Sequence, residues 1–191
     1  MLRQTAPEVF MLVIMEYNRT RAVEYARRWA FARNPLFENY TGIGGDCTNF
    51  VSQSIYAGSC VMNYTPTFGW YYISPVDRAA AWTGVQFFYN FMTANTDVGP
   101  FAREVSEGGL ELGDVIQLGR ADGTYYHTLI VTGFYESGYL ISAHSDDALD
   151  RPLATYTYST ARFLHIEGIR ISLSDRYAPD CFEDFINGIK I

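Results

Sequence analysis

The chain has 191 residues, of which 48% are hydrophobic and 18% charged, and its formal net charge is −7. This balance predicts one globular domain with a real core, with or without a small extension. It argues against a nucleic-acid binder, because such proteins present a basic face and no Lys/Arg cluster supplies one. The apolar run from residue 10 to 15 is too short to cross a membrane and is poor as a signal peptide. We therefore expect a cytoplasmic protein, or a secreted one whose leader is missing from this sequence.

Apolar residues recur at helical spacing in the first half of the chain. They predict a helix over residues 18–33, capped by Asn18 or Thr20, and a second over residues 47–57, capped by Asp46. The stretch "AWTGVQFFYNFM" is expected to form a third helix.

After residue 113 the apolar period changes to two, as it does in strands. Strands are predicted over residues 114–118, 125–134 and 139–144, the last two joined by a turn, and "ARFLHIEGIRI" adds one or two more. Helices followed by an antiparallel sheet indicate an α+β fold. The expected division is an N-terminal extension, a main domain and a C-terminal appendage: 1–16, 17–170 and 171–191.

The cysteines favour reduced thiols, because Cys47, Cys60 and Cys181 cannot all pair and lack the spacing of a disulfide scaffold. Cys47 follows "GIGGD" at the expected start of the second helix. Unpaired N–H groups and the helix dipole at that position favour a thiolate, and the same groups can stabilise the oxyanion of an acyl-transfer intermediate. A small core residue is the alternative interpretation of Cys47.

A nearby histidine would complete the activation of such a thiol. His127 opens one strand of the predicted hairpin and His144 closes the other. If Phe134 pairs with Tyr139, His127 lies opposite Asp146, and His144 is a diagonal neighbour on the same face. Both residues are then candidates to orient the ring of His127.

A three-residue hairpin loop would instead place Ser145 or Asp147 opposite His127. The third catalytic residue is therefore left open. His165 is interpreted as structural, because no acid or thiol is near it in the sequence.

The motifs "GGDCTNFVSQ" and "YHTLIVTG" are the most specific of several segments that resemble one family. With "LELGDVIQL", "LISAHSDDALDRPLATY" and "RFLHI", they resemble a bacterial amidase-domain family of the papain-like cysteine peptidase superfamily, related to CHAP and NlpC-type cell-wall amidases. The resemblance spans roughly residues 17–167. It implies a papain-like fold, in which N-terminal helices carry the nucleophile at a helix N-terminus and pack on a small antiparallel sheet.

The resemblance also implies roles for individual residues. Cys47 corresponds to the nucleophile, His127 to the base, and His144 to the polar residue that orients the imidazole. Asp147 follows in the same segment as a possible support, and Asp46 takes the place of the acid that relatives carry just before the cysteine.

Four aromatic residues are candidates for the wall of a substrate groove: Trp70, Tyr71, Tyr72 and Trp82. Core packing is an equally open interpretation, because aromatic rings serve both purposes.

We therefore expect a cysteine amidohydrolase or peptidase that cleaves peptide or amide bonds through a thioester, with peptidoglycan stem peptides as one candidate substrate. The alternatives are a transglutaminase-type acyltransferase and an inactive module that binds peptides or peptidoglycan. A zinc enzyme could use Cys47, His127 and His144 as ligands, although the glycine turn suits an acylated thiol better. We expect no metal, no cofactor and no nucleic-acid or membrane partner, and the oligomeric state is left open.

Overall fold

A computed structural model describes residues 11–136, 138–175 and 180–191. Its helices are α1 Arg19–Trp29, α2 Cys47–Ser59, α3 Ala80–Thr83, α4 Val85–Ala94 and α5 Phe182–Ile186, with 3₁₀ helices at Glu107–Gly109, Leu153–Thr155 and Leu173–Asp175. The strands are β1 Leu12–Met15, β2 Tyr72–Ser74, β3 Asp77–Arg78, β4 Gly99–Val105, β5 Val115–Gly119, β6 Tyr125–Tyr135, β7 Gly138–Ala143, β8 Ala148–Pro152 and β9 Thr160–Ser172. Within the described ranges, no helix is both long and apolar enough to cross a bilayer.

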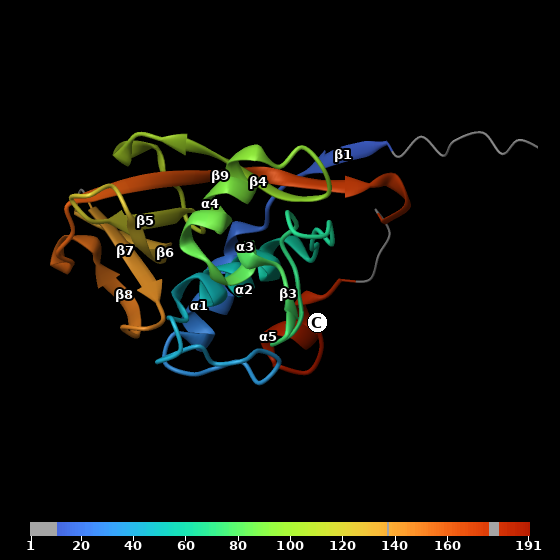
Figure 1. The fold of residues 1–191 in the computed structure, drawn as a ribbon, viewed down its shortest axis with the longest axis horizontal. Coiled ribbons are helices and arrows are strands. Elements are labelled where there is room, and N and C mark those ends of the chain that lie inside the picture. Colours follow the sequence, from blue (N-terminus) through green and yellow to red (C-terminus); the bar gives the residue numbers. More distant parts are fainter. Residues whose placement is uncertain (1–10, 137, 176–179) are drawn as a thin grey trace, which may run out of the picture.

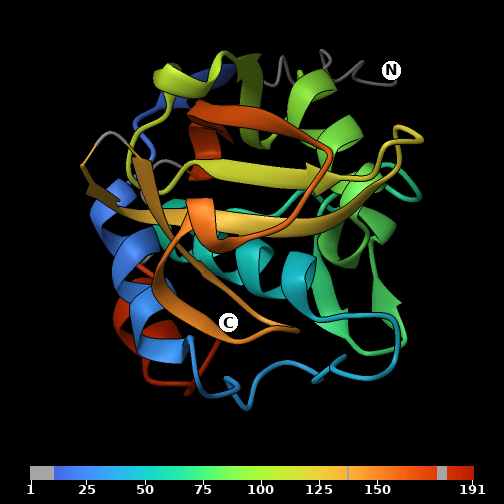
Figure 2. The ribbon, with the colours of Figure 1, turned by 90° about the vertical axis from the view of Figure 1, so that its left-hand side faces the viewer.

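The fold is a mixed α/β arrangement built on one antiparallel sheet (Figure 1). Its strand order is β1-β9-β5-β6-β7-β8, and β4 pairs with β9 as well, while β2 and β3 form a separate small sheet. The helices α1 and α2 contact each other and also β6 and β7 (Figure 2). The expected helices and antiparallel sheet are thus present, but their order is not simply helices and then strands, because β1 precedes α1 and α5 follows β9.

Alternation along the strands divides the apolar residues between two clusters. Val115 and Ile130 face the cluster that includes the helices, whereas Ile116, Leu129 and Val131 belong to a second cluster. This is the period of two that the sequence predicts for strands. The larger cluster anchors α2, the helix that begins at Cys47.

The helix boundaries depend on tertiary contacts as well as on local signals. Asn18 caps α1, because its side chain accepts a hydrogen bond from the Arg21 amide at 3.1 Å. The helix ends at Trp29, earlier than residue 33, and the Trp29 carbonyl is hydrogen-bonded to His144. Gly84 separates α3 from α4 within the stretch predicted as one helix.

The β6–β7 hairpin begins in the expected register and then shifts. Phe134 pairs with Tyr139, but an irregularity between Val131 and Gly133 moves the pairing by one residue, so that Ile130 pairs with Ser142. Because β7 ends at Ala143, the expected strand pair between His127 and Asp146 does not form. Residues of the loop that follows β7 approach His127 without pairing with it as a strand.

The expectation of reduced thiols is wrong for two of the three cysteines. Cys60, at the end of α2, forms a disulfide with Cys181, which directly precedes α5. The α5 side chains of Phe182, Phe185 and Ile186 are buried in the same core cluster as α2. The division of the chain at residue 170 stays a prediction. Helix α5, near the end of the chain, contributes to the main core.

The disulfide is expected to stabilise the fold by about 2–5 kcal/mol, because it closes a long loop in the unfolded chain. Its cysteines are 121 residues apart. Denaturant unfolding should therefore show a lower free energy of unfolding for Cys181→Ser and for Cys60→Ser, by similar amounts. A reducing agent should bring the wild type to the level of the variants and leave both variants unchanged. A wild type that is insensitive to reduction would contradict this expectation.

Candidate active site

Cys47 and His127 line one cleft with a volume of about 570 Å³. Its walls come from the glycine turn before α2, the start of β6, the loop after β7 and the segment that follows β8. Ser145, Asp146 and Arg151 also line the cleft. The cleft therefore gathers the predicted nucleophile and base with the segment in which a third catalytic residue was expected.

Cys47 is the first residue of α2 and is 6% exposed. The first turn of α2 is held to β6 through the hydroxyls of Thr48 and Thr128, which lie 2.9 Å apart. Burial raises the pKa of the Cys47 thiol, and backbone hydrogen bonding to Thr128 only partly opposes this shift. The helix N-terminus was expected to favour a thiolate, but the cost of desolvating the charge is the larger effect here.

His127 is 8% exposed, and no described residue hydrogen-bonds to its Nε2 atom. Burial lowers the pKa of His127 to about 4, while the charge of Asp146 acts in the opposite direction. The imidazole is therefore neutral near pH 7, with a buried nitrogen left unpaired beside the cleft. An unpaired buried polar atom is costly, and a catalytic role is one explanation for it.

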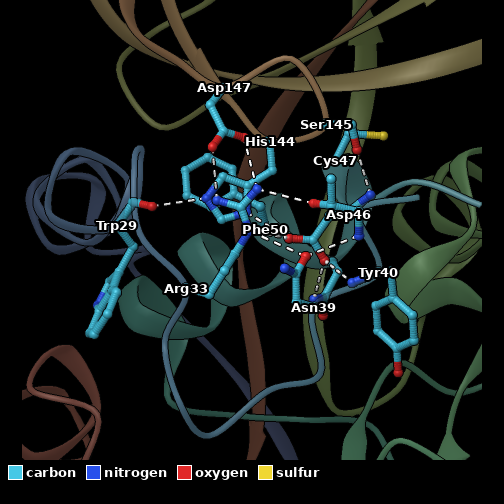
Figure 3. Close-up of polar contacts among 12 residues, drawn as sticks. Trp29, Arg33, Asn39, Tyr40, Asp46, Cys47, Phe50, His144, Ser145 and Asp147 are labelled. Atoms are coloured by element: carbon cyan, nitrogen blue, oxygen red, sulfur yellow. Dashed lines mark hydrogen bonds and ion pairs between the residues drawn. The ribbon is translucent and has the colours of Figure 1, made fainter. Parts of the chain in front are cut away.

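His144 contacts Asp46, the residue before the nucleophile, and not His127. Its Nδ1 is 2.7 Å from Asp46 Oδ2, its Nε2 is 2.8 Å from the Trp29 carbonyl, and its ring stacks on Phe50 (Figure 3). Both ring nitrogens are occupied, so neither is left to hydrogen-bond His127. These contacts differ from the interpretation in which His144 orients the base.

Asp46 is the centre of a buried polar network. Its Oδ1 accepts hydrogen bonds from the Tyr40 amide at 3.2 Å and from the Asn49 side chain at 2.8 Å. Arg33 Nε lies 3.3 Å from Oδ2 of the same carboxylate. Asp46 occupies the predicted N-cap position without a side-chain capping bond, because its oxygens bind these other groups.

The other two predicted acids pair with different arginines. Asp146 lines the cleft and pairs with Arg151 at 2.9 Å. Asp147 accepts two hydrogen bonds from Arg33, at 2.8 and 3.0 Å. Of the predicted acids, Asp146 is thus the one whose charge acts on His127.

The aromatic residues proposed for the groove wall pack elsewhere. Trp70, Tyr72 and Trp82 are buried in the main core, and Tyr71 packs partly buried against it. The aromatic residues that line the cleft are Tyr126 and Tyr156. Tyr126 adjoins His127 in "YYHTLIVTG", which is a signal that could have identified it, whereas Tyr156 has no such signal.

His165 pairs with Asp114, at 2.7 Å, and Arg19 reaches the same buried carboxylate. None of these three residues lines the cleft. This arrangement agrees with the interpretation of His165 as structural.

Metal ligands do not gather at the cleft within the described residues. The described side chains that lie close enough together to hold a metal ion are Cys60, Asp180 and Cys181. Its sulfurs are bonded to each other and offer no thiolate. Cys47, His127 and His144 form no such group in the part of the chain described.

A family model described as "Putative amidase domain" matches residues 16–166. The chain belongs to this amidase-domain family. Two proteins of Bacillus subtilis (strain 168), both described as uncharacterized, are similar to it. YhbB is 34% identical over 120 residues, which cover 61% of this chain and 37% of YhbB. YjcM is 28% identical over 162 residues, which cover 81% of this chain and 37% of YjcM.

The amidase-domain chain thus spans about 37% of the length of either relative. No solved structure matches it. The family assignment suggests amide hydrolysis, and the matched residues include both motifs around Cys47 and His127.

Proposed function

We propose that this amidase-domain protein is a papain-like cysteine amidohydrolase, in which Cys47 is the nucleophile and His127 the general base. One observation carries the proposal: Cys47, at the N-terminus of α2, shares a cleft with a buried histidine whose Nε2 has no partner among the described residues. The family assignment supports amide bonds as the target.

The proposed reaction starts from a neutral thiol and a neutral imidazole. Burial raises the pKa of Cys47 and lowers that of His127, so both shifts disfavour a resting thiolate–imidazolium pair. As Sγ attacks the amide carbonyl, Nε2 of His127 accepts the thiol proton. The imidazolium then protonates the leaving amine, and a thioester to Cys47 remains. Water, deprotonated by His127, hydrolyses the thioester to a carboxylic acid and restores the thiol.

The proposed substrate is a peptide or another amide, with peptidoglycan stem peptides as the leading candidate. Asp146 and Arg151 give the cleft one acidic and one basic side chain. A disulfide supports an exported protein, because disulfides persist in oxidising compartments. The cell wall is one such location.

Release of free amino groups from soluble peptidoglycan fragments and from a peptide mixture tests the proposal. We expect release by the wild type, in the presence of a chelator, and none by Cys47→Ala. In a hydrolase, added hydroxylamine competes with water for the thioester, so hydroxamates should form only in proportion to that competition. A dedicated acyltransferase would instead release products only when an amine is added. Fragment binding by a wild type that releases no amine would contradict the proposal and support a binding module.

A further inference from the structure

We propose that Ser145 is a catalytic residue whose hydroxyl donates a hydrogen bond to the oxyanion formed on the substrate carbonyl. The inference rests on the proposed function, since it assigns a role within the attack by Cys47. Removing one such donor in an acyl-transfer enzyme typically costs about 10²–10³ in rate.

The hydrogen bonding of Ser145 leaves its proton available. Its Oγ lines the cleft and accepts the Asp46 amide N–H at 2.5 Å. A serine hydroxyl has one donor and two acceptor positions, and this contact uses an acceptor. Within the described residues, the Ser145 hydroxyl donates no hydrogen bond to the protein. The free O–H therefore suits a ligand in the cleft.

Ser145 is also held against the turn that carries the nucleophile. The amide that it binds belongs to Asp46, the residue before the nucleophile (Figure 3), and Ser145 and Cys47 line the same cleft. A Cβ atom on Gly45 would lie 3.5 Å from Ser145 Oγ, so the glycine turn also approaches this hydroxyl closely. The Cys47 backbone N–H, at the start of α2, is the second donor in the proposed site.

The backbone of Ser145 is held in an unusual conformation. Its φ is +75°, in the left-handed region that residues other than glycine rarely adopt. Such conformations persist where the surroundings fix them, and they cluster at functional sites. The preceding residue, His144, supplies that constraint through Asp46, the Trp29 carbonyl and the Phe50 ring. His144 and Asp46 are thus positioning residues for Ser145.

Two reactions of Cys47 separate an oxyanion donor from a merely structural residue. With p-nitrophenyl acetate, Sγ attacks the ester carbonyl, passes through an oxyanion, and becomes acetylated as p-nitrophenol leaves. With iodoacetamide, Sγ displaces iodide from a saturated carbon, and no oxyanion forms. The experiment measures both rates in the full chain for the wild type, Ser145→Ala and Ser145→Gly. Ser74→Ala is a matched control, because the Ser74 hydroxyl also accepts a backbone N–H, from Asp77, outside the cleft.

We expect both Ser145 variants to lower the acetylation rate about 10²-fold and to change the alkylation rate by less than about threefold. Ser74→Ala should change neither rate. Glycine tolerates the positive φ, so full activity of Ser145→Gly would show that only the backbone conformation matters and would overturn the inference. An equal fall in both rates would overturn it too, as would unchanged acetylation. If the wild type is not acetylated at Cys47, the proposed function itself fails, and the inference fails with it.

Discussion

Replacing His127 with glutamine is expected to slow acetylation of Cys47 by about 10²–10⁴-fold, because glutamine cannot accept the thiol proton. The side chain stays neutral, like the imidazole that it replaces, so the buried position gains no charge. Stopped-flow detection of p-nitrophenol gives the rate, and circular dichroism checks that the variant is folded. His165→Gln is the matched control, since it makes the same change at a histidine outside the cleft.

The pH dependence of the same reaction tests the environment of His127. Its pKa is lowered to about 4, so the competent neutral imidazole predominates above that pH. The wild-type rate should stay within a few-fold between about pH 8 and 5 and fall as the pH approaches 4. An inflection near the ordinary histidine value of about 6.5 would contradict the burial of the base. A His127→Gln variant as fast as His165→Gln would contradict its role.

Replacing Asp46 with alanine is expected to lower the free energy of unfolding by about 3–5 kcal/mol, because breaking a buried pair leaves its partner uncompensated. Asp46 and His144 are each 1% exposed in their side chains and lie 2.7 Å apart. Arg33 and the Tyr40 amide would lose the same carboxylate. Urea unfolding, monitored by tryptophan fluorescence, measures the change.

Asp147→Ala is the matched control for this substitution. Asp147 also pairs with Arg33, but its side chain is 35% exposed, and pairs of this kind contribute about 1 kcal/mol or less. Equal losses in the two variants would show that the Asp46–His144 pair has no special role in stability. A Cys47 acetylation rate that survives in folded Asp46→Ala would remove the positioning role assigned to that pair.

The position of Cys47 was predictable because the signals for it are local. Glycines, an acid in the N-cap position and an apolar helical stripe stand next to one another in "GIGGDCTNFVSQ", and α2 begins at the expected residue. The strands β5, β6, β7 and β9 were predictable for the same reason, since their period of two is visible along each segment, whereas β1, β4 and β8 were not predicted. These signals need no knowledge of distant contacts.

The surroundings of His127 were only partly predictable from the hairpin register. Asp146 was a candidate, and its charge does act on His127, but the expected strand pair does not form because one irregularity shifts the register. The sequence does carry a hint, since Gly133 interrupts a strand pattern and such glycines often mark bulges. No sequence feature near His144 predicts its contacts. Its Nε2 partner, the Trp29 carbonyl, is 115 residues away and becomes available only where α1 ends.

The predictions of reduced cysteines and of aromatic residues in the groove wall were wrong for a similar reason. Pairing of Cys60 with Cys181 follows from the packing of α5 beside α2, which three unevenly spaced cysteines do not reveal. Trp70 and Trp82 are fully buried, and an aromatic residue in a sequence looks the same whether it lines a cleft or fills a core.

Locating the acyl group by mass spectrometry tests the central claim most directly. Because Cys60 and Cys181 are joined, Cys47 is the remaining thiol of the three cysteines. The protein is mixed briefly with p-nitrophenyl acetate, quenched in acid and digested. We expect one acetyl group on the peptide that contains Cys47, formed rapidly in the wild type and far more slowly in His127→Gln. Acetylation elsewhere while Cys47 stays free, or equal labelling of Cys47 in both proteins, would contradict it.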